Sequence, residues 1–175
     1  KGRGGGEGWV EAWSPRRLRA EPPAHPVPLP PPPSLPPQGY SDVVYLDAKH
    51  DTYLEEVSSC NLFAVSGRTI RTPPLAGSIL PGVTRASVIA LARDRGYTVL
   101  EEPVSVTDAM AADELFTTGT AVVVCSVGSL THAGKRRQYG APGVPTPVAL
   151  ELYTALTELQ QEAAPDAHGW VVQVA

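Results

Sequence analysis

The sequence predicts a mixed α/β (α+β) domain over residues 39–175, preceded by a disordered Gly/Pro-rich segment over residues 1–38. Eleven of the 19 prolines lie between Pro15 and Pro37, and residues 1–8 are mostly glycine and charge. Such a segment buries too little apolar surface to offset the entropy of ordering, so we expect disorder with stretches of polyproline II. From Gly39 onward, short β-branched runs alternate with helical periodicity, which indicates strands and helices in one domain.

Six strands are expected in this domain. Runs of apolar and β-branched residues predict them at residues 42–46, 53–56, 61–65, 69–71, 97–101 and 115–124, the last with a break at Gly119. Ser58 and Ser59 separate the second strand from the third, and Ser66-Gly67-Arg68 makes a turn before the fourth.

Three helices are expected between and after these strands. Apolar residues recur at helical spacing over residues 83–95, and Gly96 closes that helix just after its C-cap. Thr107 is expected to cap a short helix over residues 107–113. Residues 147–162 carry leucines on or near one face and predict an amphipathic helix.

The composition argues against several classes of function. A net charge of −4 gives no electrostatic footprint for nucleic acid, and no apolar run is long enough to span a membrane. Cys60 and Cys125 are too few for a disulfide scaffold, and we expect both to be buried, unreactive thiols. The histidines are scattered without ligand spacing, so no metal site is predicted. We expect an intracellular protein, with plastid, mitochondrion and cytoplasm not distinguished.

Two adjacent carboxylates, Glu55 and Glu56, lie on one predicted strand. Neighbouring residues of a strand point to opposite faces, so one of the two carboxylates points toward the interior. A buried charge is costly unless it meets a cation. The inward carboxylate is therefore expected to pair either with an arginine, as an ordinary ion pair, or with the cationic ring nitrogen of a ligand.

A loop rich in proline and glycine, residues 72–82, runs directly into the helix predicted at residues 83–95. The first turn of a helix has free N–H groups and carries the positive end of the helix dipole. Gly82 allows an anion to approach closely, and Thr84 adds a hydroxyl group. The combination suits a phosphate group, and an ordinary helix start explains it equally well.

A polar tight turn, Thr117-Thr118-Gly119-Thr120-Ala121, lies between two apolar runs. Small residues and hydroxyls at a break in a strand present N–H groups to a carboxylate or a phosphate. A simple bulge or hairpin turn explains the same residues, so this turn alone does not define a site.

Five stretches of the chain are similar to one known family, in that family's order and spacing. They are Tyr-Leu-Asp-Ala at 45–48, Tyr-Leu-Glu-Glu-Val-Ser-Ser-Cys-Asn-Leu-Phe at 53–63, Thr-Pro-Pro-Leu with Ile-Leu-Pro-Gly-Val-Thr-Arg within 72–85, Ala-Asp-Glu-Leu-Phe-Thr-Thr-Gly-Thr-Ala at 112–121, and Gly-Trp at 169–170. Together they resemble the class IV pyridoxal-phosphate aminotransferases, and among these the branched-chain amino acid aminotransferases. The resemblance covers nearly all of residues 39–175. It implies the carboxy-terminal, cofactor-binding domain of a fold-type IV enzyme, a mixed sheet or pseudo-barrel with packed helices.

The resemblance also implies roles for individual residues. Glu56 corresponds to the carboxylate that pairs with the protonated ring nitrogen of pyridoxal phosphate, and Leu80 to the residue that packs against the ring. The residues implied at the cofactor phosphate are Gly82, Val83, Thr84 and Thr120. The residues implied at the substrate α-carboxylate are Gly119, Thr120 and Ala121.

The implied reaction transfers the amino group of leucine, isoleucine or valine to 2-oxoglutarate, in an enzyme that is usually a homodimer. The family's Schiff-base lysine precedes the segment matching residues 39–42, and Lys1, Lys49 and Lys135 do not occupy that position. We therefore expect no catalytic residue here, no match to the family's amino-terminal domain, and no activity from this chain alone. The alternatives are another class IV enzyme (a D-amino acid aminotransferase or an aminodeoxychorismate lyase) and a non-catalytic, truncated or regulatory remnant.

Overall fold

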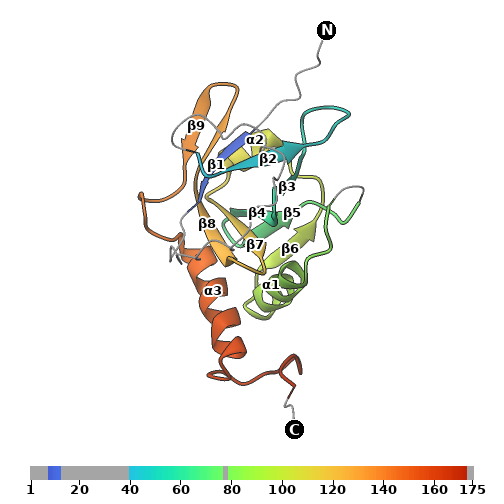
Figure 1. The fold of residues 1–175 in the computed structure, drawn as a ribbon, viewed down its shortest axis with the longest axis vertical. Coiled ribbons are helices and arrows are strands. Elements are labelled where there is room, and N and C mark those ends of the chain that lie inside the picture. Colours follow the sequence, from blue (N-terminus) through green and yellow to red (C-terminus); the bar gives the residue numbers. More distant parts are fainter. Residues whose placement is uncertain (1–7, 13–39, 77–78, 173–175) are drawn as a thin grey trace, which may run out of the picture.

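A computed structural model describes residues 40–76 and 79–172, together with the backbone of residues 8–12. Nine strands and three helices lie within these residues (Figure 1). The strands are β1 Gly8–Ala12, β2 Asp42–Leu46, β3 Leu54–Val57, β4 Cys60–Ser66, β5 Thr69–Thr72, β6 Thr98–Glu101, β7 Glu114–Gly119, β8 Val123–His132 and β9 Lys135–Gln138. The helices are α1 Val83–Asp94, α2 Val106–Ala111 and α3 Pro147–Gln160.

All nine strands belong to one sheet, in the order β3-β2-β1-β8-β7-β4-β5-β6, with β9 paired to β8. β3 also pairs with β4, so six strands (β3, β2, β1, β8, β7 and β4) close into a ring. The pairings are antiparallel except for β5 with β6, two strands joined through α1. The predicted mixed α/β fold with a pseudo-barrel and packed helices is confirmed.

The strand β1 corrects one expectation. Residues 1–38 were expected to lack regular structure, yet the backbone of Gly8–Ala12 pairs with β2 on one side and β8 on the other. Composition does not reveal such a strand, because its main-chain groups are satisfied by segments far away in sequence. The rest of that segment lies outside the described residues, as do residues 77–78 and 173–175.

Two hydrophobic cores lie on the two faces of the sheet. The first, which we call the inner core, contains residues from all five ring strands whose side chains are described. It therefore fills the interior of the ring. Val106 and Ala109 of α2 also belong to it and close the ring at one end. The second, the outer core, lies between the sheet and the helices α1 and α3. At its centre Phe63 of β4 stacks on Phe116 of β7, with ring centroids 4.8 Å apart.

The helix ends follow the sequence in two cases and differ from it in one. α1 ends at Asp94 and Gly96 has a φ of 75°, as expected for the glycine that follows the C-cap. α3 begins at Pro147, as predicted. The short helix is capped by Ser105 rather than Thr107, because Ser105 and Asp108 form a reciprocal capping box that Thr107 does not offer.

A buried carboxylate completes the start of α3. Thr146 is the N-cap of α3 but makes no side-chain cap hydrogen bond. Instead Glu114 of β7, only 8% exposed, accepts hydrogen bonds from the backbone N–H groups of Val148 (3.0 Å) and Ala149 (3.4 Å). An anion at a helix N-terminus satisfies free donors and complements the helix dipole. Glu114 thereby fixes α3 against the outer face of the sheet.

We expect Glu114→Gln to lower the free energy of unfolding by about 1–2 kcal/mol, because it removes the charge that α3 meets at its N-terminus. Urea unfolding followed by circular dichroism measures the change. Glu158→Gln, at an exposed position of the same helix, is the control and should stay within about 0.5 kcal/mol of the parent. Equal losses for the two variants would contradict this account of the cap.

Candidate functional site

A row of three polar side chains crosses the sheet on its outer face. Glu56 of β3 stands opposite Asn61 of β4, and Asn61 stands opposite Thr118 of β7. Directly opposed residues of paired strands point to the same face. The row Glu56–Asn61–Thr118 therefore lies on the same face of the sheet as the outer core. The outer core begins two residues farther along, with Phe63 of β4 and Phe116 of β7.

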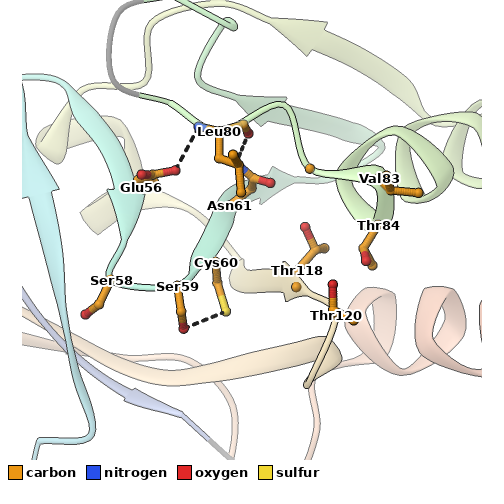
Figure 2. Close-up of a pocket in the computed structure, with 12 residues that line it drawn as sticks. Glu56, Ser58, Ser59, Cys60, Asn61, Leu80, Val83, Thr84, Thr118 and Thr120 are labelled. Atoms are coloured by element: carbon orange, nitrogen blue, oxygen red, sulfur yellow. Dashed lines mark hydrogen bonds between the residues drawn. The ribbon is translucent and has the colours of Figure 1, made fainter.

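The amino terminus of α1 lies against this row, and two hydrogen bonds hold it there (Figure 2). The Asn61 amide nitrogen donates to the Leu80 carbonyl oxygen at 2.9 Å. The Leu80 N–H donates to the Glu56 carboxylate at 3.1 Å. Both polar ends of Leu80 are thus bound by sheet residues, and the helix begins three residues later at Val83.

Gly82 is required here by space rather than by its backbone angles. Its φ of −62° suits any residue, but an added Cβ would lie 2.3 Å from the Asn61 amide oxygen. Gly82 is the N-cap of α1 and supplies no side-chain cap, and the first turn contains no acidic residue. The positive end of α1 therefore faces the row without an anion of its own.

These elements enclose an open cavity of about 140 Å³. Its lining residues are Glu56, Ser58, Ser59, Cys60, Asn61, Leu80, Gly82, Val83, Thr84, Thr118, Gly119 and Thr120. Pockets that enclose a whole small molecule usually measure roughly 300–1,000 Å³. The described residues therefore form one side of a site, enough to hold part of a ligand.

The structure brings most of the sequence-predicted residues together. Seven of them line the cavity: Glu56, Leu80, Gly82, Val83, Thr84, Gly119 and Thr120. Ala121 does not line it; this residue is exposed at the turn between β7 and β8. Leu80 and Val83 are 67% and 83% exposed, so the apolar rim of the cavity is uncovered by the described residues.

Two residues of the row were not singled out from the sequence. Asn61 is 5% exposed and Thr118 is 1% exposed, and both line the cavity. Asn61 had a signal: Ser58 and Ser59 form a two-residue hairpin loop, which places Val57 opposite Cys60 and Glu56 opposite Asn61. Thr118 belongs to the polar turn noted in the sequence, but no local pattern showed that its side chain lies in this row, because its place depends on the long-range register of β4 with β7.

The donor set fits a ligand that carries an anion at one end and a cationic ring at the other. The uncapped start of α1 and the hydroxyls of Thr84 and Thr120 suit a phosphate group. Glu56, the one charged side chain among the described lining residues, suits a protonated ring nitrogen. The hydroxyl of Thr118 is buried and has no hydrogen-bond partner in the described part of the chain, which leaves it available to the ligand.

The two cysteines behave differently from each other. Cys125 is buried, and burial raises the pKa of its thiol to about 11, as expected for an unreactive thiol. Cys60 is only partly buried and lines the cavity, with its sulfur 3.6 Å from the Ser59 hydroxyl oxygen. The expectation of a buried Cys60 is therefore wrong, because Gly119, which lies against it on β7, has no side chain to cover it.

No lysine within the described residues lines the cavity. Lys49 lies in the exposed turn between β2 and β3, and Lys135 is exposed at the start of β9. Within those same residues there is no cluster of three potential metal ligands. Nor does this part of the chain contain a helix long and apolar enough to cross a membrane.

Residues 36–130 match the family described as amino-transferase class IV. The chain therefore belongs to the class IV aminotransferases, a family that uses pyridoxal phosphate. Several branched-chain amino acid aminotransferases are among its relatives. The chloroplastic branched-chain-amino-acid aminotransferase 5 of Arabidopsis thaliana is 51% identical over 137 residues, or 78% of this chain. A methionine aminotransferase of the same plant is 41% identical over 137 residues.

Solved structures give the same family. The branched-chain amino acid aminotransferase of Escherichia coli has a TM-score of 0.67 and 34% identity, and the match covers 77% of this chain and 42% of that one. A branched-chain aminotransferase from Thermoproteus uzoniensis, solved with norvaline, has a TM-score of 0.59 and 30% identity, and the match covers 69% of this chain and 37% of that one. A further branched-chain amino acid aminotransferase, solved with pyridoxamine 5′-phosphate, has a TM-score of 0.65 and 34% identity. This chain spans about a third of the Arabidopsis enzyme that it matches at 51%.

The contact between Gly82 and Asn61 leads to a non-additive prediction. We expect Gly82→Ala to destabilise the protein by about 1–3 kcal/mol, because its methyl group has no room beside the Asn61 amide. In an Asn61→Ala background the same change should cost less than about 0.5 kcal/mol, since the obstructing amide is gone. Chemical unfolding of the two single variants and the double variant measures the coupling. Additive effects would show that the clash does not set the requirement for glycine.

Proposed function

We propose that this chain is the cofactor-binding part of a branched-chain amino acid aminotransferase. The observation that carries the proposal is the row Glu56–Asn61–Thr118 facing the uncapped start of α1. A carboxylate at one end and a helix N-terminus at the other match a cofactor with a basic ring nitrogen and a phosphate. Family membership and the identity of 51% to a chloroplastic branched-chain enzyme support the same assignment.

Glu56 acts at the ring nitrogen in this proposal. Its carboxylate accepts the N–H of Leu80 and still has free lone pairs that face the cavity. A carboxylate beside a pyridine nitrogen keeps that nitrogen protonated. Pyridoxal phosphate, when bound, supplies an electron sink for the charge that develops at the substrate Cα. The hydrogen bond from Leu80 orients Glu56 and so ties the ring contact to the position of α1.

The start of α1 holds the phosphate in this proposal. The N–H groups that follow Gly82 and the Thr84 hydroxyl supply donors, and Thr120 adds a donor from the β7–β8 turn. Leu80 packs against the ring, and its 67% exposure leaves the apolar surface that such packing needs. No Lys or Arg lines the cavity within the described residues, so this half-site supplies neutral donors and a dipole rather than a full charge.

The substrates that we propose are leucine, isoleucine and valine, with 2-oxoglutarate as the amino acceptor. Gly119, Thr120 and Ala121 form the turn that would receive the substrate α-carboxylate, close to the phosphate donors. The methionine aminotransferase at 41% identity shows that side-chain preference varies among related sequences, so the assay should compare leucine with methionine. Relatives named chloroplastic or mitochondrial support an intracellular location, and a homodimer is the proposed assembly.

A second, non-catalytic function has one observation in its favour. The cavity has no lysine among its described lining residues, so these residues place no amine where it could bind the cofactor covalently and move its proton. We propose that the chain taken alone binds the cofactor without turning substrate over, and acts as a binding remnant or as a partner of an intact subunit. Co-purification with a complete class IV aminotransferase tests the partner role.

We expect Glu56→Gln to weaken the binding of pyridoxamine 5′-phosphate about 10- to 100-fold, because a charge-assisted hydrogen bond to the ring nitrogen is lost. Pyridoxamine 5′-phosphate is the right probe because it forms no Schiff base with exposed lysines. Isothermal titration calorimetry gives the affinity. Glu55→Gln, the neighbour on the same strand that does not line the cavity, is the matched control and should bind as the parent does. Equal affinity of the Glu56 variant and the parent would argue against the ring contact.

We also expect the purified chain to transfer no amino group from leucine to 2-oxoglutarate when pyridoxal phosphate is supplied. General acid–base help from a positioned amine is worth about 10²–10⁴-fold in rate, and no lysine within the described residues lines the cavity. A coupled assay for glutamate measures turnover, and borohydride reduction followed by peptide mapping locates any lysine bound to the cofactor. Turnover of leucine would overturn the expectation, and the labelled residue would show whether Lys1, Lys49 or Lys135 binds the cofactor.

A further inference from the structure

Thr118 is a buried polar residue for which the fold has no evident use. Its side chain lies on β7, 1% exposed, and its hydroxyl oxygen has no hydrogen-bond partner among the described residues. A hydroxyl that is taken out of water and left unpaired destabilises a protein, so such groups usually have a partner. The buried threonine Thr72 follows that rule, since its hydroxyl donates to the Leu62 carbonyl at 2.8 Å.

The surroundings of Thr118 direct the missing partner into the cavity. Asn61, directly opposite on β4, already uses its amide nitrogen on Leu80 and presses its amide oxygen toward Gly82. Figure 2 shows Thr118 between Asn61 and the hydroxyls of Thr84 and Thr120, and all four residues line the cavity. The unpaired hydroxyl therefore lies beside the start of α1, at the end of the cavity that favours an anion.

We infer that Thr118 is a further ligand-binding residue, whose hydroxyl donates a hydrogen bond to the phosphate group of the cofactor beneath the start of α1. The inference rests on the proposed cofactor site. It adds a donor from the sheet, on β7, to the donors that Thr84 and the first turn of α1 supply. Bound phosphate would then satisfy two defects of the free protein together: the uncapped positive end of α1 and the orphaned hydroxyl of Thr118.

Stability and binding separate this role from a structural one. If Thr118 serves the ligand, Thr118→Val removes an unpaired buried hydroxyl and leaves the ligand-free protein as stable as the parent or more stable. The same change weakens binding. If Thr118 serves the fold, Thr118→Val lowers stability in the way that Thr72→Val should, since Thr72→Val breaks a buried hydrogen bond.

The experiment compares the parent with Thr118→Val, Thr118→Ser and the control Thr72→Val in the full chain. Thermal unfolding is measured without ligand, and the affinity for pyridoxamine 5′-phosphate is measured by calorimetry. The ³¹P resonance of the bound ligand reports on its phosphate directly. We expect Thr118→Val to bind about 10- to 100-fold more weakly, with a shifted ³¹P resonance and an unchanged or higher melting temperature. Thr118→Ser should recover the affinity of the parent, and Thr72→Val should melt earlier with unchanged affinity.

The outcomes also distinguish this inference from the function on which it rests. Tight binding by the parent and equal binding by Thr118→Val would overturn the role of Thr118 and leave the cofactor site standing. A lower melting temperature of Thr118→Val with an unchanged ³¹P resonance would assign Thr118 to the fold and overturn the role as well. A parent chain without affinity for pyridoxamine 5′-phosphate would overturn both.

Discussion

Five residue pairs join β4 to β7, from Asn61 with Thr118 to Val65 with Glu114, and both the core and the site are built along this ladder. One face of β7 carries three functions at alternate positions: Glu114 holds the start of α3, Phe116 stacks at the centre of the outer core, and Thr118 reaches the cavity. A slip of one residue would turn all three to the other face. The tightly packed Phe63–Phe116 pair therefore fixes the site as firmly as it fixes the fold.

The site is polar at its floor and apolar at its rim, and this division follows from where its parts originate. The floor comes from the sheet, where Asn61 and Thr118 are almost completely buried. The rim comes from the loop before α1 and the first residue of that helix, where Leu80 and Val83 respectively remain mostly exposed. The two are joined at Leu80, whose N–H and carbonyl both bind the floor. A ligand that spans floor and rim would cover the apolar surface that the described chain leaves in water.

Much of this arrangement could be predicted from local patterns, and the remainder depends on long-range pairing. Periodicity and Gly96 predicted α1, and the adjacent carboxylates with the family resemblance pointed to Glu56. The cap of the short helix was misplaced because a reciprocal pair, Ser105 with Asp108, outweighs a single favourable residue. The strand β1 and the position of the Thr118 side chain had no local signal, since partners distant in sequence determine both. Asn61 is an intermediate case. The two-residue loop Ser58-Ser59 already places it opposite Glu56, whereas its pairing with Thr118 depends on a strand distant in sequence.

The place of β1 has a consequence for how the chain folds during synthesis. β1 is the first of the described strands to be synthesised, and it pairs with both β2 and β8. Its partner β8 is made more than a hundred residues later. Until then one edge of β1 stays unpaired, and the ring is open. Closure of the ring carries a large loop entropy cost, and folds dominated by such distant contacts form slowly. The ring is therefore completed only after β8 has been made, and a nascent chain stalled before residue 123 exposes edges on which neighbouring chains pair.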